Sequence, residues 1–367
     1  LVTLNKELDI IPDLAESWDI SDDGKTYTFN LRNDIKFSNG DKVTASDFKW
    51  SIERAANPDT GSMNAEVYLG DIVGVTEVIE AGGSLTEVTG LKVIDEKTLE
   101  ITIDEPKTYF LAKLTYPTAF VLSEKFVTQQ GENWIDQPVG TGPFVMTEYQ
   151  IGQTLKLKPN DNYWGEKAKV DGIIMNLAGG VSMAMYENDE VDITGVGLAD
   201  LERVKNPNDP LNKDLVNVPP QFSLNYIGFN VNMPPFDDVN FRKALSHAVD
   251  KEIIADKIYS GLTKPAFSII PPGFPGYSPN IEGLSFNEEL AKEYLAKSKY
   301  ADPASRPRII VTIPGTGGSP GLDTEVISDM WKETLGVEVE IQQVEWATYL
   351  QDMNRKRLQL WAGSGWQ

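Results

Sequence analysis

The chain of 367 residues contains no cysteine and a single histidine, His247. These absences leave no cysteine nucleophile, no ordinary Ser-His or Cys-His pair and no zinc site built from Cys and His. Carboxylate chemistry stays open, because Asp and Glu together number 55. A chain of this length folds without disulfides, so the lack of cysteine identifies no compartment. His247 falls on a helix expected to begin near Asp238, and we interpret it as a structural histidine.

Positive charge is scarce. Lys and Arg number 33, the formal net charge is -22 and the pI is about 4.5. Phosphate recognition needs clustered Lys and Arg, so this balance argues against nucleic acid or an anionic membrane surface as a partner. No apolar run approaches the roughly 20 residues that a membrane-spanning helix requires. We interpret the acidity mainly as a source of solubility.

The chain also lacks an initiator Met, a charged-then-apolar leader and a lipid-attachment cysteine at its start. At its other end, an apolar strand over residues 358–362 is expected to run into a small-residue turn before Gln367. We therefore expect the sequence to be a piece of a longer protein, truncated at both ends.

Residues 1–130 read as a β-rich region with interspersed helix. Tyr27, Phe29 and Leu31 alternate with polar residues, which predicts a half-buried strand. Residues 44–47 fit a capping box that opens a helix ending near Asn57. A hairpin is predicted over residues 91–103.

The remainder divides into residues 131–232 and residues 233–367, with the boundary at the Pro-Pro pair 234–235. The middle region carries predicted strands at 191–193 and 225–230. The last region opens with a predicted helix from 238 to 258 and has a second helix near 288–296. From 307 onward the pattern becomes βαβαβ, with strands at 309–313, 337–344 and 358–362, which predicts parallel strands joined by right-handed crossovers.

In an open parallel sheet, ligands bind beyond the carboxyl ends of the strands. Those ends are here a Gly-rich segment at 314–319, then Trp346, and then a final small-residue segment. The candidate ligand residues of that final segment are Gly363, Ser364, Gly365 and Trp366. Glycines leave backbone groups accessible and tryptophans supply apolar walls, which suits an elongated, partly polar ligand. The alternative is that both tryptophans are core residues and the glycines only form turns.

Other motifs are weaker. Residues 315–318 imitate a dinucleotide loop, but the glycine spacing is wrong. Residues 140–143 lack the Lys-Ser/Thr of a phosphate loop. The acidic residues of 187–192 lack the ligand spacing of an EF-hand, and we interpret them as a solvated turn. We expect no catalytic residue, no metal site and no cofactor.

A set of motifs spread over nearly the whole chain resembles the family 5 extracellular solute-binding proteins, the oligopeptide and dipeptide receptors of ABC importers. The most specific motif runs through residues 15–18, 23–32, 36–41 and 44–48. Further matches lie at 138–144, 190–193, 234–239, 242–245, 271–273 and 365–366.

The resemblance implies an α/β, two-lobed periplasmic-binding-protein fold of type II, with an extra β-rich subdomain in the first lobe. It implies a receptor that captures short peptides between its lobes and delivers them to a membrane ABC permease. It adds Tyr226, on the strand approaching the hinge, and Tyr68, in a loop of the small subdomain, as ligand residues. The protein is then expected to be a monomer, periplasmic or anchored at the cell surface.

The sequence departs from the family pattern in several places. The aspartate that pairs with a peptide's α-amine in the family would lie past Gln367. We also expect the N-terminal segment that hydrogen-bonds the peptide backbone in the family to be absent from this sequence. Receptors for oligosaccharides, nickel complexes and haem belong to the same family, and the tryptophans keep a sugar ligand open. From other classes, a carboxylate-dependent hydrolase and a cytoplasmic sensor with a DNA-binding domain are the alternatives.

Overall fold

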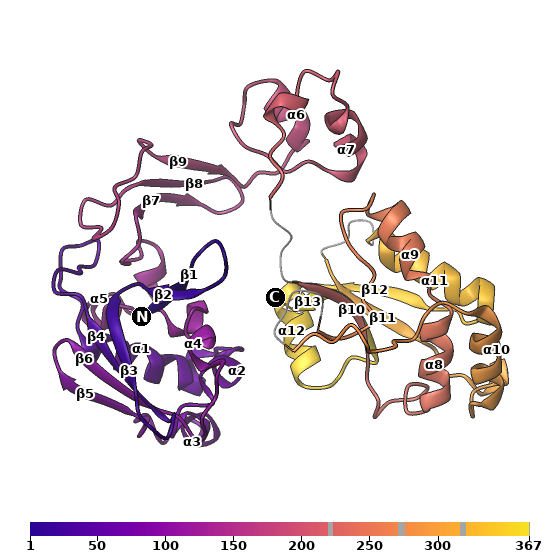
Figure 1. Cartoon of the computed structure of the whole chain (residues 1–367), viewed down its shortest axis with the longest axis horizontal. Coiled ribbons are helices and arrows are strands. Elements are labelled where there is room, and N and C mark those ends of the chain that lie inside the picture. Colours follow the sequence, from indigo (N-terminus) through magenta and orange to yellow (C-terminus); the bar gives the residue numbers. More distant parts are fainter. Residues whose placement is uncertain (219–222, 271–275, 316–320, 367) are drawn as a thin grey trace. The chain divides into compact units, whose positions relative to one another are not determined.

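The computed structural model describes residues 1–218, 223–270, 276–315 and 321–366. The chain forms two compact units, Leu1–Val181 and Ser182–Gln367 (Figure 1). This division differs from the predicted boundaries after residues 130 and 232, which stay predictions about the lobes of the family fold.

The first unit is built from three antiparallel sheets and short helices. Its strands are β1 (Val2–Leu4), β2 (Ile10–Pro12), β3 (Ala15–Ile20), β4 (Thr26–Leu31), β5 (Leu91–Asp95), β6 (Thr98–Thr102), β7 (Phe144–Gln150), β8 (Thr154–Pro159) and β9 (Ile173–Asn176). The sheet orders are β1-β2, β3-β4-β6-β5 and β7-β8-β9. Its helices are α1 (Ala45–Ala56), η1 (Pro58–Thr60), α2 (Ala65–Leu69), α3 (Val75–Glu80), α4 (Phe110–Lys113), η2 (Pro117–Ala119), α5 (Glu124–Gln130) and η3 (Gly131–Ile135).

Local sequence signals explain this unit well. The alternation in β4 buries Tyr27, Phe29 and Leu31 against the core, as predicted. The predicted capping box is confirmed, because Thr44 N–H donates to Asp47 Oδ2 at 2.9 Å and Thr44 Oγ1 accepts from Asp47 N–H at 3.4 Å. The predicted hairpin is β5 and β6.

One buried carboxylate ties three segments of the first unit together. Asp71 is 8% exposed and accepts hydrogen bonds from Lys107 at 2.7 Å and Lys113 at 2.5 Å. Burial alone would raise the pKa of Asp71, but the two lysines outweigh it and lower that pKa below its ordinary value of 3.8. Lys107 also pairs with Asp104.

The second unit contains α6 (Ser182–Glu187), α7 (Leu198–Lys205), η4 (Asn212–Asp214), β10 (Leu224–Phe229), α8 (Val239–His247), α9 (Lys251–Ile253), η5 (Ile254–Ile258), α10 (Glu288–Lys297), η6 (Pro303–Ser305), β11 (Ile310–Pro314), α11 (Leu322–Leu335), β12 (Glu340–Val344), α12 (Trp346–Asn354) and β13 (Leu360–Trp366). Its sheet has the order β10-β13-β11-β12. The predicted parallel pairing is confirmed for β11 with β12 and for β11 with β13, whereas β10 runs antiparallel to β13.

Within this unit, α8, α10 and α11 lie on one side of the sheet and α12 on the other (Figure 1). This follows from right-handed crossovers that run in opposite directions, from β11 outward to β12 and then back to β13. The core beneath α8, α10 and α11 includes Phe241 and Trp331, and the indole Nε1 of Trp331 donates to Leu245 O at 2.9 Å.

Three predicted elements are wrong in detail. The helix predicted from 238 to 258 breaks after α8, because Asp250 caps a new start by accepting from the amides of Glu252 and Ile253. Residues 191–193 form no strand, and Ile193 is 89% exposed. The final segment, predicted to turn after residue 362, continues as strand to Trp366.

Candidate ligand-binding site

The carboxyl ends of β11 and β13 lie side by side at one end of the second unit's sheet. We call this end of the sheet, with residues 363–366 of β13, the ligand edge. Strand β11 ends at Pro314, and its ladder with β13 holds the pairs Val311 with Leu360 and Thr312 with Trp361. A Cβ at Gly363 would lie 3.1 Å from Cδ of Pro314, so β13 passes close by the end of β11. The crossover that leaves β11 and the crossover that returns to β13 cover opposite faces of the sheet. The edge between these two strands is therefore the switch point at which α/β sheets bind ligands.

Strand β13 contains a bulge at this edge. Gly228 pairs with Trp361 and Tyr226 pairs with Ser364, so two steps along β10 (226 to 228) match three steps along β13 (361 to 364). Gly363 lies in this interval with a φ of 72°, a left-handed conformation that glycine adopts without strain. The small residues predicted as a turn are thus the bulged continuation of a strand.

Trp346, the first residue of α12, lies directly beyond β12. Its side chain is 50% exposed, so the alternative of a core residue is wrong for this tryptophan. Its ring stacks on Tyr349 with 5.8 Å between centroids, and Tyr349 is fully buried. The Tyr349 hydroxyl donates to Ala362 O on β13 at 3.2 Å. Tyr349 therefore connects the exposed tryptophan to the strand that carries the other candidates.

Tyr226 lies on β10 opposite Ser364 and is 38% exposed. Its neighbours Leu224 and Asn225 take the positions opposite Trp366 and Gly365. The structure describes only the backbone of residues 364–366, and their side chains lie outside the description. Tyr226 thus lies on the same stretch of sheet as the Gly-Ser-Gly-Trp segment, and its role as a ligand residue stays a prediction.

Tyr68 belongs to the first unit, whereas the other candidates belong to the second. It lies on helix α2, where a loop was predicted, so that expectation is wrong. Its ring lies flat on Tyr116 with 3.6 Å between centroids and an interplanar angle of 4°. Burial, together with Tyr116, raises the pKa of Tyr68 above its ordinary value.

Sequence reasoning missed three residues that shape this edge: Tyr349, Gly228 and Trp361. The ring of Trp361 lies directly on Gly228, because a Cβ there would come within 2.1 Å of the indole Cε2. The indole Nε1 of Trp361 is buried and has no hydrogen-bond partner among the described residues. The spacing Trp346-x-x-Tyr349 on one helix face was a signal for the first of these, whereas the Gly228–Trp361 contact has no local signal.

Residues 9–367 match the family described as bacterial extracellular solute-binding proteins, family 5. The chain belongs to this family. It is 31% identical to the dipeptide-binding protein DppE of Bacillus subtilis over 98% of this chain and 67% of that protein. It is 32% identical to the periplasmic oligopeptide-binding protein OppA of Escherichia coli over 97% of this chain and 66% of that protein.

The fold of this family 5 protein matches solved relatives along its whole length. A structure titled Listeria monocytogenes OppA bound to peptide superposes with a TM-score of 0.82 at 29% identity, covering 100% of this chain and 74% of that one. The two-lobed α/β periplasmic-binding-protein fold is therefore confirmed. The chain spans about two thirds of the length of the curated relatives it matches. Among the described residues, no helix has both the length and the apolarity to cross a membrane.

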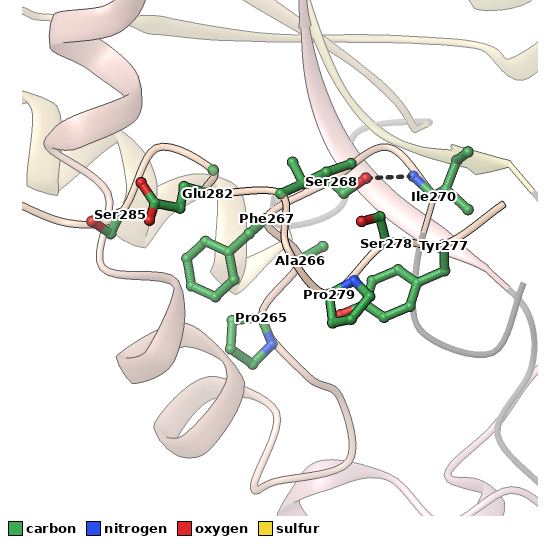
Figure 2. A pocket seen from close by; sticks show the side chains of 12 residues that line it. Pro265, Ala266, Phe267, Ser268, Ile270, Tyr277, Ser278, Pro279, Glu282 and Ser285 are labelled. Carbon is green, nitrogen blue, oxygen red and sulfur yellow. Dashed lines mark hydrogen bonds between the residues drawn. The ribbon is translucent and has the colours of Figure 1, made fainter.

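A separate pocket of about 390 Å³ lies in the segment between η5 and α10 of this family 5 protein (Figure 2). Phe267, Tyr277 and Glu282 are among its lining residues, and it contains none of the predicted ligand residues. Next to it, Lys251 Nζ donates to Ala266 O at 3.1 Å and Leu284 O at 3.3 Å. Lys251 thus holds Ala266 and Leu284 together as a clamp. Burial lowers the pKa of Lys251.

The single histidine and the acidic turn have structural roles, whereas most of the Gly-rich segment lies outside the described residues. His247 is 6% exposed, its Nδ1 lies 2.7 Å from Ser285 O and its ring stacks on Tyr294, as expected of a structural histidine. In the acidic turn, Glu187 pairs with Arg203. The described residues contain no group of three or more acidic or His side chains able to hold a metal. Residues 316–320 lie outside the described residues, and they include most of the dinucleotide-like segment 315–318 and of the Gly-rich segment 314–319.

Proposed function

We propose that this protein captures short peptides and delivers them to a membrane ABC permease, without catalytic turnover. The observation that carries the proposal is the backbone of β13 at residues 363–366. Residues 364–366 pair with β10 on one edge, while the ladder with β11 on the other edge ends at Trp361. Among the described residues, no second strand pairs with 363–366.

A strand edge of this kind offers a row of backbone N–H and C=O groups to an extended chain. Two of these four residues, Gly363 and Gly365, have no side chain of their own. Recognition through a ligand's main chain depends little on the ligand's side chains, which favours loose sequence selectivity. The names of the relatives, which bind dipeptides and oligopeptides, support the same class of ligand.

The test is calorimetry on the full-length protein with a tripeptide and its N-acetylated analogue. We expect the free peptide to bind and the acetylated form to bind at least tenfold more weakly. A cationic amine buried without a carboxylate partner would cost several kcal/mol, so a peptide site must supply that partner. Equal affinities would remove the amine-carboxylate pair, and no binding of any peptide would overturn the proposal.

A second candidate ligand is an oligosaccharide, favoured by the half-exposed ring of Trp346 at the end of β12. A flat aromatic surface of this kind packs against an apolar sugar face as well as against a side chain. Tighter binding of a cello- or manno-oligosaccharide than of any peptide, in the same calorimeter, would move the protein to that branch of the family. A nickel-complex ligand and a carboxylate-dependent hydrolase are the remaining alternatives.

The proposal extends to the setting of the protein. We propose a monomer with no nucleic-acid partner, held in the periplasm or anchored at the cell surface, with the second lobe beginning near residue 233. Family membership supports an extracytoplasmic location, and the net charge of -22 supports the lack of nucleic acid. Incubation of full-length protein with a peptide library, followed by mass spectrometry, tests turnover. Cleavage beyond one product per protein would show an enzyme.

A further inference from the structure

We propose that Gly363 and Tyr349 are positioning residues that set the register of β13 at the ligand edge, rather than ligand contacts. The ligand part of this inference rests on the proposed function, whereas the register part does not. It reassigns Gly363, which the sequence suggested as a ligand residue, and gives a role to Tyr349, which the sequence did not single out.

The bulge changes the face of the sheet on which each later position of β13 falls. Leu360 and Ala362 are buried in the core of the second unit. Regular alternation would give position 364 the same face as those two residues. The extra residue in β13 instead places position 364 opposite Tyr226, so that it falls on the same face of the sheet as positions 228 and 361. The bulge therefore moves positions 364 and 366 from the face of Leu360 and Ala362 to the opposite face.

Gly363 is suited to this role by its backbone. Its φ of 72° lies in the left-handed region, where a residue with a Cβ is strained. The end of β11 also lies close to it, because a Cβ at this position would be 3.1 Å from Cδ of Pro314. Upstream, the contact of Gly228 with the Trp361 ring fixes the pair that precedes the bulge.

Tyr349 holds the bulge from the side of α12. Its buried hydroxyl donates to the carbonyl of Ala362, the residue directly before Gly363. The same ring supports Trp346 by stacking. One buried side chain thus links the exposed aromatic wall to the strand edge, so a shift of either would be transmitted to the other.

The first test compares Gly363→Ala with Gly363→Asn in the full-length protein. Both variants add the same Cβ near Pro314, but asparagine tolerates the left-handed conformation far better than alanine does. In the absence of ligand, we expect amide hydrogen exchange of residues 364–366 to speed up about tenfold or more in the alanine variant. The asparagine variant should stay close to wild type, and exchange at Leu360 should stay unchanged in both. Equal acceleration in both variants, or in neither, would overturn the assignment.

The second test measures peptide binding. Gly363→Ala should weaken the affinity about tenfold and Tyr349→Phe about threefold to tenfold, with the melting temperature nearly unchanged for Tyr349→Phe. Recovery of affinity in Gly363→Asn would mark a backbone role, whereas loss in both Gly363 variants would mark direct contact and overturn the inference. If wild-type protein binds no peptide, the proposed function fails, and the exchange experiment alone still decides the register.

Discussion

The two units of this protein reach their sheets by different routes. In the first unit, both outer pairs of the four-stranded sheet are hairpins, β3 with β4 and β5 with β6, joined by short turns. In the second unit, the strand that carries the candidate site, β13, pairs with β10 and β11, which lie far from it in sequence. Local sequence therefore specifies the two outer pairings of the first sheet but not its central pairing of β4 with β6. The candidate site in the second unit depends on distant pairings alone. Substitutions in each unit should separate the two cases.

The largest effects should come from the two cores, which share no residue. Phe29→Ala in the first unit and Trp331→Ala in the second should each lower the free energy of unfolding by about 3–5 kcal/mol, because both side chains are fully buried. Calorimetric scans of the full-length protein should show each substitution shifting a different transition. Ile151→Ala, at an 83% exposed site, is the control. A single transition shifted by both would show that the units unfold as one.

Next is the close approach of β10 to β13. Gly228→Ala would place a Cβ 2.1 Å from the Trp361 ring, so the strands must separate or the ring must move. We expect a loss of about 3 kcal/mol, at the upper end for overpacking. Gly140→Ala in the first unit, where a Cβ meets no atom within 4 Å, is the matched control. Urea unfolding measures both, and equal losses would contradict the contact.

Ligand binding should divide the aromatic candidates of the two units. Trp346→Ala should weaken peptide binding by about 2 kcal/mol, as expected for an exposed aromatic anchor that becomes buried against a ligand. Trp346→Phe should retain most of the affinity. Tyr68→Phe should have a smaller effect, because the Tyr68 ring already stacks on Tyr116. Calorimetry checks all three, and an unchanged affinity in folded Trp346→Ala would remove this residue from the site.

The smallest effect concerns acid stability of the first unit. The pKa of Asp71 in the folded state lies below its value of about 3.9 in the unfolded state. The ionised Asp71 carboxylate therefore stabilises the fold above about pH 3.9, and this contribution is lost as the pH falls through the folded-state pKa. Asp71→Asn should cost about 1.5 kcal/mol at pH 7, and the difference from wild type should shrink below pH 4. Denaturant unfolding against pH measures this. Asp41→Asn, which breaks the exposed pair with Lys125, should cost far less, and an equal cost would contradict a special role for Asp71.

Much of the fold was predictable because its signals are local. The capping box at Thr44 and the alternation of Tyr27, Phe29 and Leu31 involve neighbouring residues, and both are confirmed. The βαβαβ pattern after residue 307 also appears as predicted, with three strands in parallel. The helix from 238 was predicted too long, because the Asp250 cap competes with the apolar periodicity on which that prediction relied.

The site was predictable only in part. The rule for strand ends located Trp346 and the final segment, and the structure brings Tyr226 to the same edge. The bulge at Gly363 was not predictable, because its register depends on β10 and on Pro314, both distant in sequence. For the same reason a strand was mistaken for a turn, since a run of Gly and Ser is typical of turns unless a partner strand lies beside it.

The clamp formed by Lys251 has a consequence for the length of the segment that it holds. One side chain holds the carbonyls of Ala266 and Leu284 together, so the two ends of the intervening segment are fixed by contacts outside that segment. Once loop ends are fixed, each doubling of the loop adds only about 0.6 kcal/mol of closure entropy. Residues engineered into the stretch between these two anchor points should therefore cost little stability, and α10 should keep its place in the second unit.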